Sequence, residues 1–170
     1  MAKRVYTKKG DIYEIIVDNT YKRYLQLIGY DLECLNSDTF RVFKKSYPVD
    51  YNPTMDEILK DDIDFYVHSF AGGGIHDGIW NLAYRSKEVG KLDDIKFRSI
   101  GELPPPRMSF SEYVFSSSRV WTFNGNDSHL ICGKLPKKWE GAYHGGVLQP
   151  KNILYRIKYG KFRSEPRYKE

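Results

Sequence analysis

Cysteine is scarce in this chain, and long apolar runs are missing. Two cysteines, Cys34 and Cys132, occur among 170 residues. Secreted scaffolds of this size usually carry more cysteines at regular spacing, so we expect both thiols to be reduced. No run approaches the length of a membrane-spanning helix, and no apolar segment follows Met1-Ala2-Lys3-Arg4 as in a signal peptide. The sequence therefore predicts a cytoplasmic protein with no membrane association.

The common catalytic and metal-binding motifs are also missing. The two cysteines and four histidines show no CxxC, HxH or HExxH spacing, and no serine lies in a G-x-S-x-G motif. His76-Asp77 is the nearest approach to a catalytic pair. It follows Gly72-Gly73-Gly74, which lacks the Lys-Ser/Thr of a P-loop and the spacing of a dinucleotide-binding motif. We expect these glycines to form a flexible loop, and we expect no enzymatic activity, no metal and no cofactor.

Charge is unevenly distributed along the chain. The net charge is +5, but residues 131–170 alone contain ten Lys/Arg and three Asp/Glu. Such a basic region suits contact with nucleic acid or with an acidic protein, and equally a solvated helix face followed by a polar tail.

What the chain has in quantity is aromatic residues, at 15% of the total. Aromatic and β-branched residues favour strands, and several runs with strand-like composition are separated by turn signals. We predict a hairpin over residues 11–29, strands near 39–45, 63–70 and 91–98, a serine loop at 116–118, and a hairpin around Asn124-Gly125.

Two short helices complete the prediction. One spans about 54–61, where Thr54 and Glu57 have the spacing of a capping box. The other begins at Pro150 and ends near Gly160. The predicted fold is a single α+β domain over residues 10–160, with a mainly antiparallel twisted sheet or partial barrel. A basic N-terminal arm (1–9) and a polar C-terminal tail (161–170) flank it. The sequence does not indicate an oligomeric state.

The run Lys8-Lys9-Gly10-Asp11-Ile12-Tyr13-Glu14-Ile15, followed by a Tyr-rich strand, resembles the start of the bacterial immunity protein 26 family. The layout is similar over most of residues 8–158, including Asp64-Phe65-Tyr66-Val67-His68, a strand at Trp121 and a helix after Pro150. The resemblance implies a non-enzymatic bacterial protein of a polymorphic toxin system. Such a protein is made beside a toxin, which it binds and neutralises, and it brings no catalytic residues.

Two segments are candidates for contacting a protein partner. Asp62 and Asp64 lie on the same face of a predicted strand, about 7 Å apart. They could meet a cationic toxin, serve as a hydrolytic pair, or form a solvated turn. The segment from Trp139 to His144 combines aromatic rings with glycine, which suits an interface hot spot and equally a ring that covers the core edge. The candidate partner-binding residues are Asp62, Asp64, His76, Trp139, Tyr143 and His144.

An alternative is a small β-rich nucleic-acid-binding module. Arg41, Lys44 and Lys45 surround Phe43 on a predicted strand. Sheets that bind single-stranded nucleic acid stack bases on such rings and hold phosphates with nearby cations.

Overall fold

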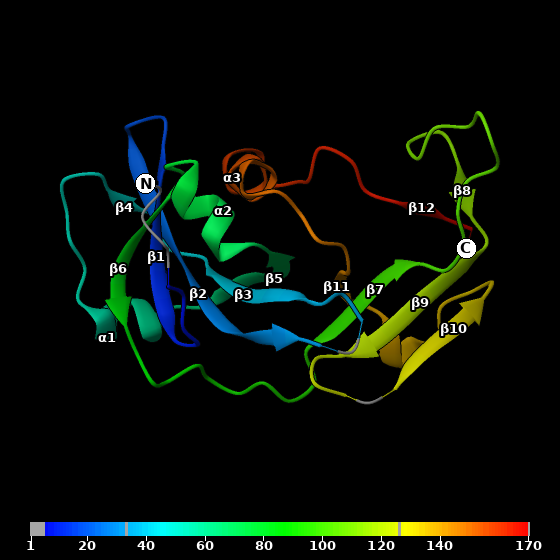
Figure 1. The fold of residues 1–170 in the computed structure, drawn as a ribbon, viewed down its shortest axis with the longest axis horizontal. Coiled ribbons are helices and arrows are strands. Elements are labelled where there is room, and N and C mark those ends of the chain that lie inside the picture. Colours follow the sequence, from blue (N-terminus) through cyan, green and yellow to red (C-terminus); the bar gives the residue numbers. More distant parts are fainter. Residues whose placement is uncertain (1–5, 33, 126, 170) are drawn as a thin grey trace.

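Two open sheets of six and four strands form most of the structure (Figure 1), a computed structural model that describes residues 6–32, 34–125 and 127–169. The helices are α1 (Met55–Leu59), α2 (Ala71–His76), the 3-10 turn η1 (Lys137–Trp139) and α3 (Pro150–Tyr159). The strands are β1 (Asp11–Val17), β2 (Tyr21–Asp31), β3 (Ser37–Phe43), β4 (Tyr47–Pro48), β5 (Ile63–Ser69), β6 (Trp80–Arg85), β7 (Lys96–Ile100), β8 (Val114–Phe115), β9 (Ser117–Thr122), β10 (Ser128–Cys132), β11 (Tyr143–His144) and β12 (Arg167–Tyr168). The α+β class, with mainly antiparallel strands in unclosed sheets, is confirmed.

The first sheet has the order β5-β3-β2-β1-β6, and β4 pairs with β2. The predicted hairpin is β1–β2, and its turn places Asp18 and Asn19 at φ 49° and 55°. Short polar side chains tolerate this left-handed conformation, which is why the sequence signal was reliable there. In β3 the alternation divides Phe40 and Val42 from Phe43, which belongs to a different buried cluster.

Each face of this sheet is covered by different elements. Helices α2 and α3 pack over one face (Figure 1), where Ile153 and Ile157 of α3 join the largest buried cluster. On the other face, Ile58 of α1 packs with Phe43 and Tyr47. The capping box predicted at the start of α1 is confirmed, since the Thr54 hydroxyl accepts a hydrogen bond from the Glu57 amide and the Glu57 side chain caps the Thr54 amide.

The second sheet has the order β10-β9-β7-β11. The hairpin predicted around Asn124 is β9–β10, and Asn124 takes φ 58°. The predicted serine loop is wrong in part, because Ser117 and Ser118 begin β9 and are buried. Ser118 is tolerated there because its hydroxyl accepts a hydrogen bond from Arg98 Nε at 2.9 Å.

The C-terminal helix ends as predicted, with Gly160 in the left-handed conformation at φ 73°. Beyond it, the segment expected to be a polar tail lies against the protein. Phe162 packs edge-on against Phe65, with ring centroids 5.7 Å apart, and β12 pairs with β8. Residues 1–5 of the predicted basic arm lie outside the described residues.

The triple glycine was predicted to be a flexible loop and is instead part of helix α2. Its geometry explains the glycine at position 74. A Cβ atom there would lie 2.2 Å from the indole of Trp80, which is 1% exposed. The helix can therefore lie directly on Trp80 only where the side chain is absent. Gly72, in contrast, has no heavy atom within 4 Å of the corresponding position.

This difference predicts opposite effects for two alanine substitutions. Gly74→Ala should destabilise the protein by about 1–3 kcal/mol, because the new methyl group overlaps the Trp80 ring. Gly72→Ala should be neutral or stabilise it by up to about 1 kcal/mol through helix propensity. Urea unfolding of both variants measures this, and equal effects would show that packing on Trp80 does not require the glycine.

Candidate functional site

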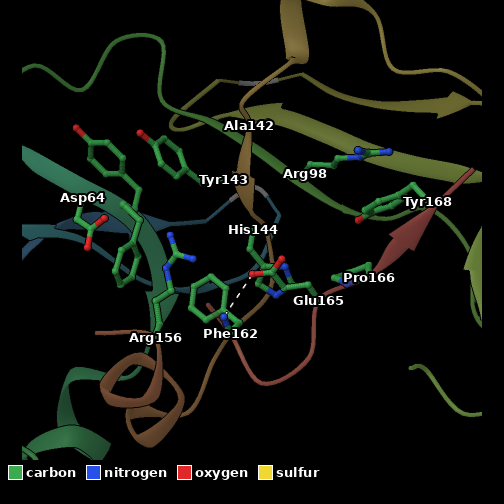
Figure 2. Close-up of a pocket in the computed structure, with 12 residues that line it drawn as sticks. Asp64, Arg98, Ala142, Tyr143, His144, Arg156, Phe162, Glu165, Pro166 and Tyr168 are labelled. Carbon is green, nitrogen blue, oxygen red and sulfur yellow. Dashed lines mark hydrogen bonds between the residues drawn. The ribbon is translucent and has the colours of Figure 1, made fainter. Parts of the chain in front are cut away.

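A cleft of about 370 Å³ lies where the first sheet meets the second (Figure 2). It is walled by β5, β7, β11, α3 and the C-terminal segment. The lining residues are Asp64, Phe65, Tyr66, Arg98, Ala142, Tyr143, His144, Arg156, Phe162, Glu165, Pro166 and Tyr168.

Strand β11 positions one wall of the cleft. It pairs in parallel with β7, and Tyr143 packs edge-on against Tyr66 with ring centroids 5.1 Å apart. Directly after it, a Cβ atom on Gly145 would lie 2.3 Å from the Trp121 ring, so the chain can approach the second sheet this closely only as glycine. The Gly145 amide donates to the Arg98 carbonyl at 2.7 Å, which fixes the position of His144 beside it.

The C-terminal segment forms the opposite wall. The guanidinium of Arg156 lies 5.1 Å from the Phe65 centroid and 5.2 Å from that of Phe162. At the other end, Arg98 lies 3.4 Å from the centroid of Tyr168. Figure 2 shows His144 and Glu165 between these two arginines. Cation–π contacts hold both arginines in place together with hydrogen bonds, which Arg98 donates to the Ser118 hydroxyl and Arg156 to the Gly160 carbonyl.

Among the described residues, the acidic groups of the cleft form no ion pair with its arginines. Asp64 forms an ion pair with Arg23 at 2.7 Å. Within the described part of the chain, neither Arg98 nor Arg156 forms an ion pair with a carboxylate. Burial lowers the pKa of Arg98, opposed by Tyr168, although an arginine stays protonated in water. A partly desolvated cation without an acidic partner favours binding of an external anionic group.

His144 is kept neutral by its surroundings. Burial lowers the pKa of His144 below 6.5, a nearby Glu165 opposes this, and His68 adds to it. The ring lies 5.6 Å from that of Phe162. Its place in the cleft therefore suits a neutral hydrogen-bonding group.

The lowered pKa of His144 has a consequence for stability. As the pH falls below 6.5, the unfolded chain binds a proton that the folded chain resists, so the free energy of unfolding decreases until the folded pKa is passed. We expect wild type to lose more stability between pH 7.5 and 5 than His144→Gln, measured by urea unfolding. His76→Gln is the control, because the side chain of His76 is 82% exposed. Equal losses in wild type and His144→Gln would contradict the assignment.

A buried polar cluster joins the two sheets. The Asp31 carboxylate lies 2.9 Å from His68 Nε2 and accepts a hydrogen bond from Trp121 Nε1 at 2.9 Å. It also accepts one from the Cys34 amide at 3.1 Å. Burial raises the pKa of Asp31, but these hydrogen bonds outweigh it, and the pKa lies below its ordinary value. The charged Asp31 carboxylate therefore connects β2 to β5 and β9 through hydrogen bonds.

Three of the six residues predicted to contact a protein partner lie together in the cleft: Asp64, Tyr143 and His144. The other three do not line it. The Asp62 side chain is exposed, and His76 is an exposed residue at the end of α2 beside Asp77. Trp139 is 5% exposed, so it covers the core edge and does not present its ring.

The structure does not form the surface expected for nucleic-acid binding. Phe43 is 1% exposed and packs in the core, where no base could stack on it. Arg41 is also buried and donates from Nε to Gln26 at 2.8 Å. Only Lys44 and Lys45 of that set are exposed. The predicted ring flanked by cations is corrected to a core ring with two lysines nearby.

Sequence reasoning missed the cleft residues that come from distant segments: Arg98, Arg156, Phe162, Glu165 and Tyr168. The net charge of residues 131–170 pointed to this region, but it could not say which cations face a cavity.

Within the described residues, no helix combines the length and apolar character needed to cross a membrane, and no cluster of three or more His, Cys, Asp or Glu could hold a metal ion. Comparison with protein-family models, curated proteins and solved structures found no match.

Proposed function

We propose that this protein binds a protein toxin through the cleft and neutralises it without catalysis. The observation that carries the proposal is the concentration of tyrosine and arginine in one open cleft. Tyr66, Tyr143, Tyr168, Arg98 and Arg156 all line it. Tyrosine and arginine are enriched among the residues that dominate protein–protein binding energy, because each offers a large contact area and directional hydrogen bonds.

The chemistry of the lining supports binding. The twelve described residues of the cleft include no serine, threonine, cysteine or lysine that could act as a nucleophile. The histidine present is held neutral by burial, and one of the two carboxylates is already paired with Arg23. These groups are suited to hydrogen bonding and charge pairing with a partner's side chains.

The toxin as the class of partner is suggested by the sequence resemblance. The opening run and the layout over most of residues 8–158 resemble the immunity protein 26 family, and the resemblance implies neutralisation of a toxin by direct contact. In the mechanism we propose, a side chain of the toxin enters the cleft, and the surrounding surface sterically blocks the toxin's own site. The basic C-terminal region accelerates encounter with an acidic surface.

The experiment is capture of the tagged protein's partner from its own cells, with nuclease treatment, followed by a test of the captured protein. We expect one stoichiometric protein that survives nuclease and moderate salt, inhibits growth when produced alone, and is harmless when produced with this chain. A partner that is nucleic acid, or a captured protein whose effect this chain leaves unchanged, would contradict the proposal.

A further inference from the structure

Strand β10 pairs on one side only, with β9, among the residues that the structure describes. It ends the second sheet at the edge opposite β11 (Figure 1), and β11 lines the cleft. Its ladder with β9 is regular over all five residues, from Ser128 to Cys132. A regular edge strand presents unpaired backbone N–H and C=O groups along its free side, which makes it a template for another strand.

The edges of the first sheet are protected, and this contrast singles out β10. On the β5 edge, the Leu148 amide donates to the His68 carbonyl at 2.9 Å, and Val147 forms a bridge with His68. On the β6 edge, the register with β1 shifts between Ile12 and Tyr13, which is a bulge. Covering segments and bulges are the usual ways in which proteins block edge-to-edge pairing.

The residues of β10 itself do nothing to prevent pairing. None of Ser128, His129, Leu130, Ile131 and Cys132 is an acid, a lysine, an arginine or a proline. Leu130 is 55% exposed. Exposed edge strands are normally protected by charge or proline, so an uncharged one with an exposed leucine indicates a strand that is covered in the working protein.

The charges at the two ends of β10 favour a second copy of this chain as the partner that pairs with the strand. Asp127 precedes the strand, Lys134 follows it closely, and both are exposed. When two copies pair antiparallel about Leu130, each Leu130 faces the other, and the end of β10 beside Asp127 in one copy meets the end beside Lys134 in the second. The same contact forms twice, as a two-fold interface requires. We propose that this protein forms a homodimer through antiparallel pairing of β10 with β10.

This register fixes the separation of the two Cys132 residues in the dimer. Cys132 of one copy faces Ser128 of the other, so the two Cys132 residues are offset by four positions, about 13 Å along the strands. A disulfide needs Cα atoms about 4.4–6.8 Å apart, so the dimer is not disulfide-linked.

Sedimentation velocity of the purified chain across a wide concentration range, with reductant present and absent, tests the proposal. We expect a monomer–dimer equilibrium that reductant leaves unchanged. Leu130→Lys should weaken association about 100-fold, because two like charges would then face each other at the centre. Asp127→Lys and Lys134→Asp should each weaken it about tenfold, and the double variant should return to near the wild-type value, because the exchanged charges again attract.

The charge-exchange variants test the proposal even if Leu130→Lys does not fold. Asp127 and Lys134 are both exposed, so replacing them should leave the fold intact. A chain that stays monomeric at all concentrations overturns the proposal and leaves the edge open to a strand of another protein. A dimer that dissociates on reduction, or one that ignores the charge reversals, overturns it as well. Because β10 and the cleft lie at opposite edges of the second sheet, neither result bears on the proposed function.

Discussion

Replacing Asp31 by alanine is expected to lower the free energy of unfolding by about 3–5 kcal/mol, which is the effect of removing one partner of a buried charged cluster. Asp31 is 2% exposed, and its carboxylate receives donors from His68, Trp121 and the Cys34 amide. Alanine leaves the Trp121 N–H and the His68 ring without their partner inside the protein. It also removes the contact that joins β2 to β5 and β9.

Replacing Asp31 by asparagine tests the contribution of its charge, because asparagine has nearly the same shape and is neutral. It keeps one oxygen that can accept from His68 and Trp121, but its amide group faces the Cys34 N–H. We therefore expect Asp31→Asn to cost about 1–2 kcal/mol, less than alanine. Urea unfolding at neutral pH measures both variants. If alanine costs no more than asparagine, the buried hydrogen bonds do not hold the sheets together.

Acid unfolding adds a second test of Asp31. Its folded pKa is lowered from 3.8, so its contribution is complete above pH 3.8 and is lost as the pH falls toward the folded value. The stability advantage of wild type over Asp31→Asn should therefore shrink below pH 3.8. A difference that stays constant across that range would show that the carboxylate is not charged in the folded protein.

Reversing the charge of Arg156 is expected to weaken binding of the proposed toxin partner about 30-fold or more, the effect of losing a hot-spot residue. The Arg156 guanidinium lies 5.1 Å from the centroid of Phe65 and 5.2 Å from that of Phe162, and it has no carboxylate partner in the described part of the chain. Glutamate there would repel an anionic side chain and remove the stacked surface. Titration calorimetry with the captured partner measures the loss.

Lys151→Glu is the matched control for Arg156→Glu. Lys151 lies on the same helix and is exposed, and the change in charge is identical. At the first turn of a helix an acidic group is tolerated or favourable, so folding should be unaffected. Equal weakening by both substitutions would mean that the partner responds to net charge and does not contact the cleft.

Local signals account for the parts of the fold that could be predicted. The β1–β2 hairpin, the capping box of Thr54, and the helix bounded by Pro150 and Gly160 each depend on residues within a few positions of one another. The physical cause in each case is a backbone conformation or a cap that one residue type supplies. Such features can be predicted from a single sequence.

The cleft and helix α2 could not be predicted because they depend on tertiary packing. Gly74 is required by contact with the Trp80 ring, whereas a triple glycine ordinarily favours a loop. The arginines of the cleft, Arg98 and Arg156, are brought together only when the C-terminal segment lies against both sheets. The same applies to Phe43, which was predicted on a strand beside cations but whose face of the sheet is covered by α1.

The most direct test of neutralisation through the cleft is the growth of cells that produce the captured partner together with wild type, Arg156→Glu or Lys151→Glu. Neutralisation through the cleft predicts normal growth with wild type and Lys151→Glu, and growth inhibition with Arg156→Glu present at the same level of folded protein. Full protection by Arg156→Glu, with its affinity for the toxin unchanged, would contradict the claim that the cleft is the binding site.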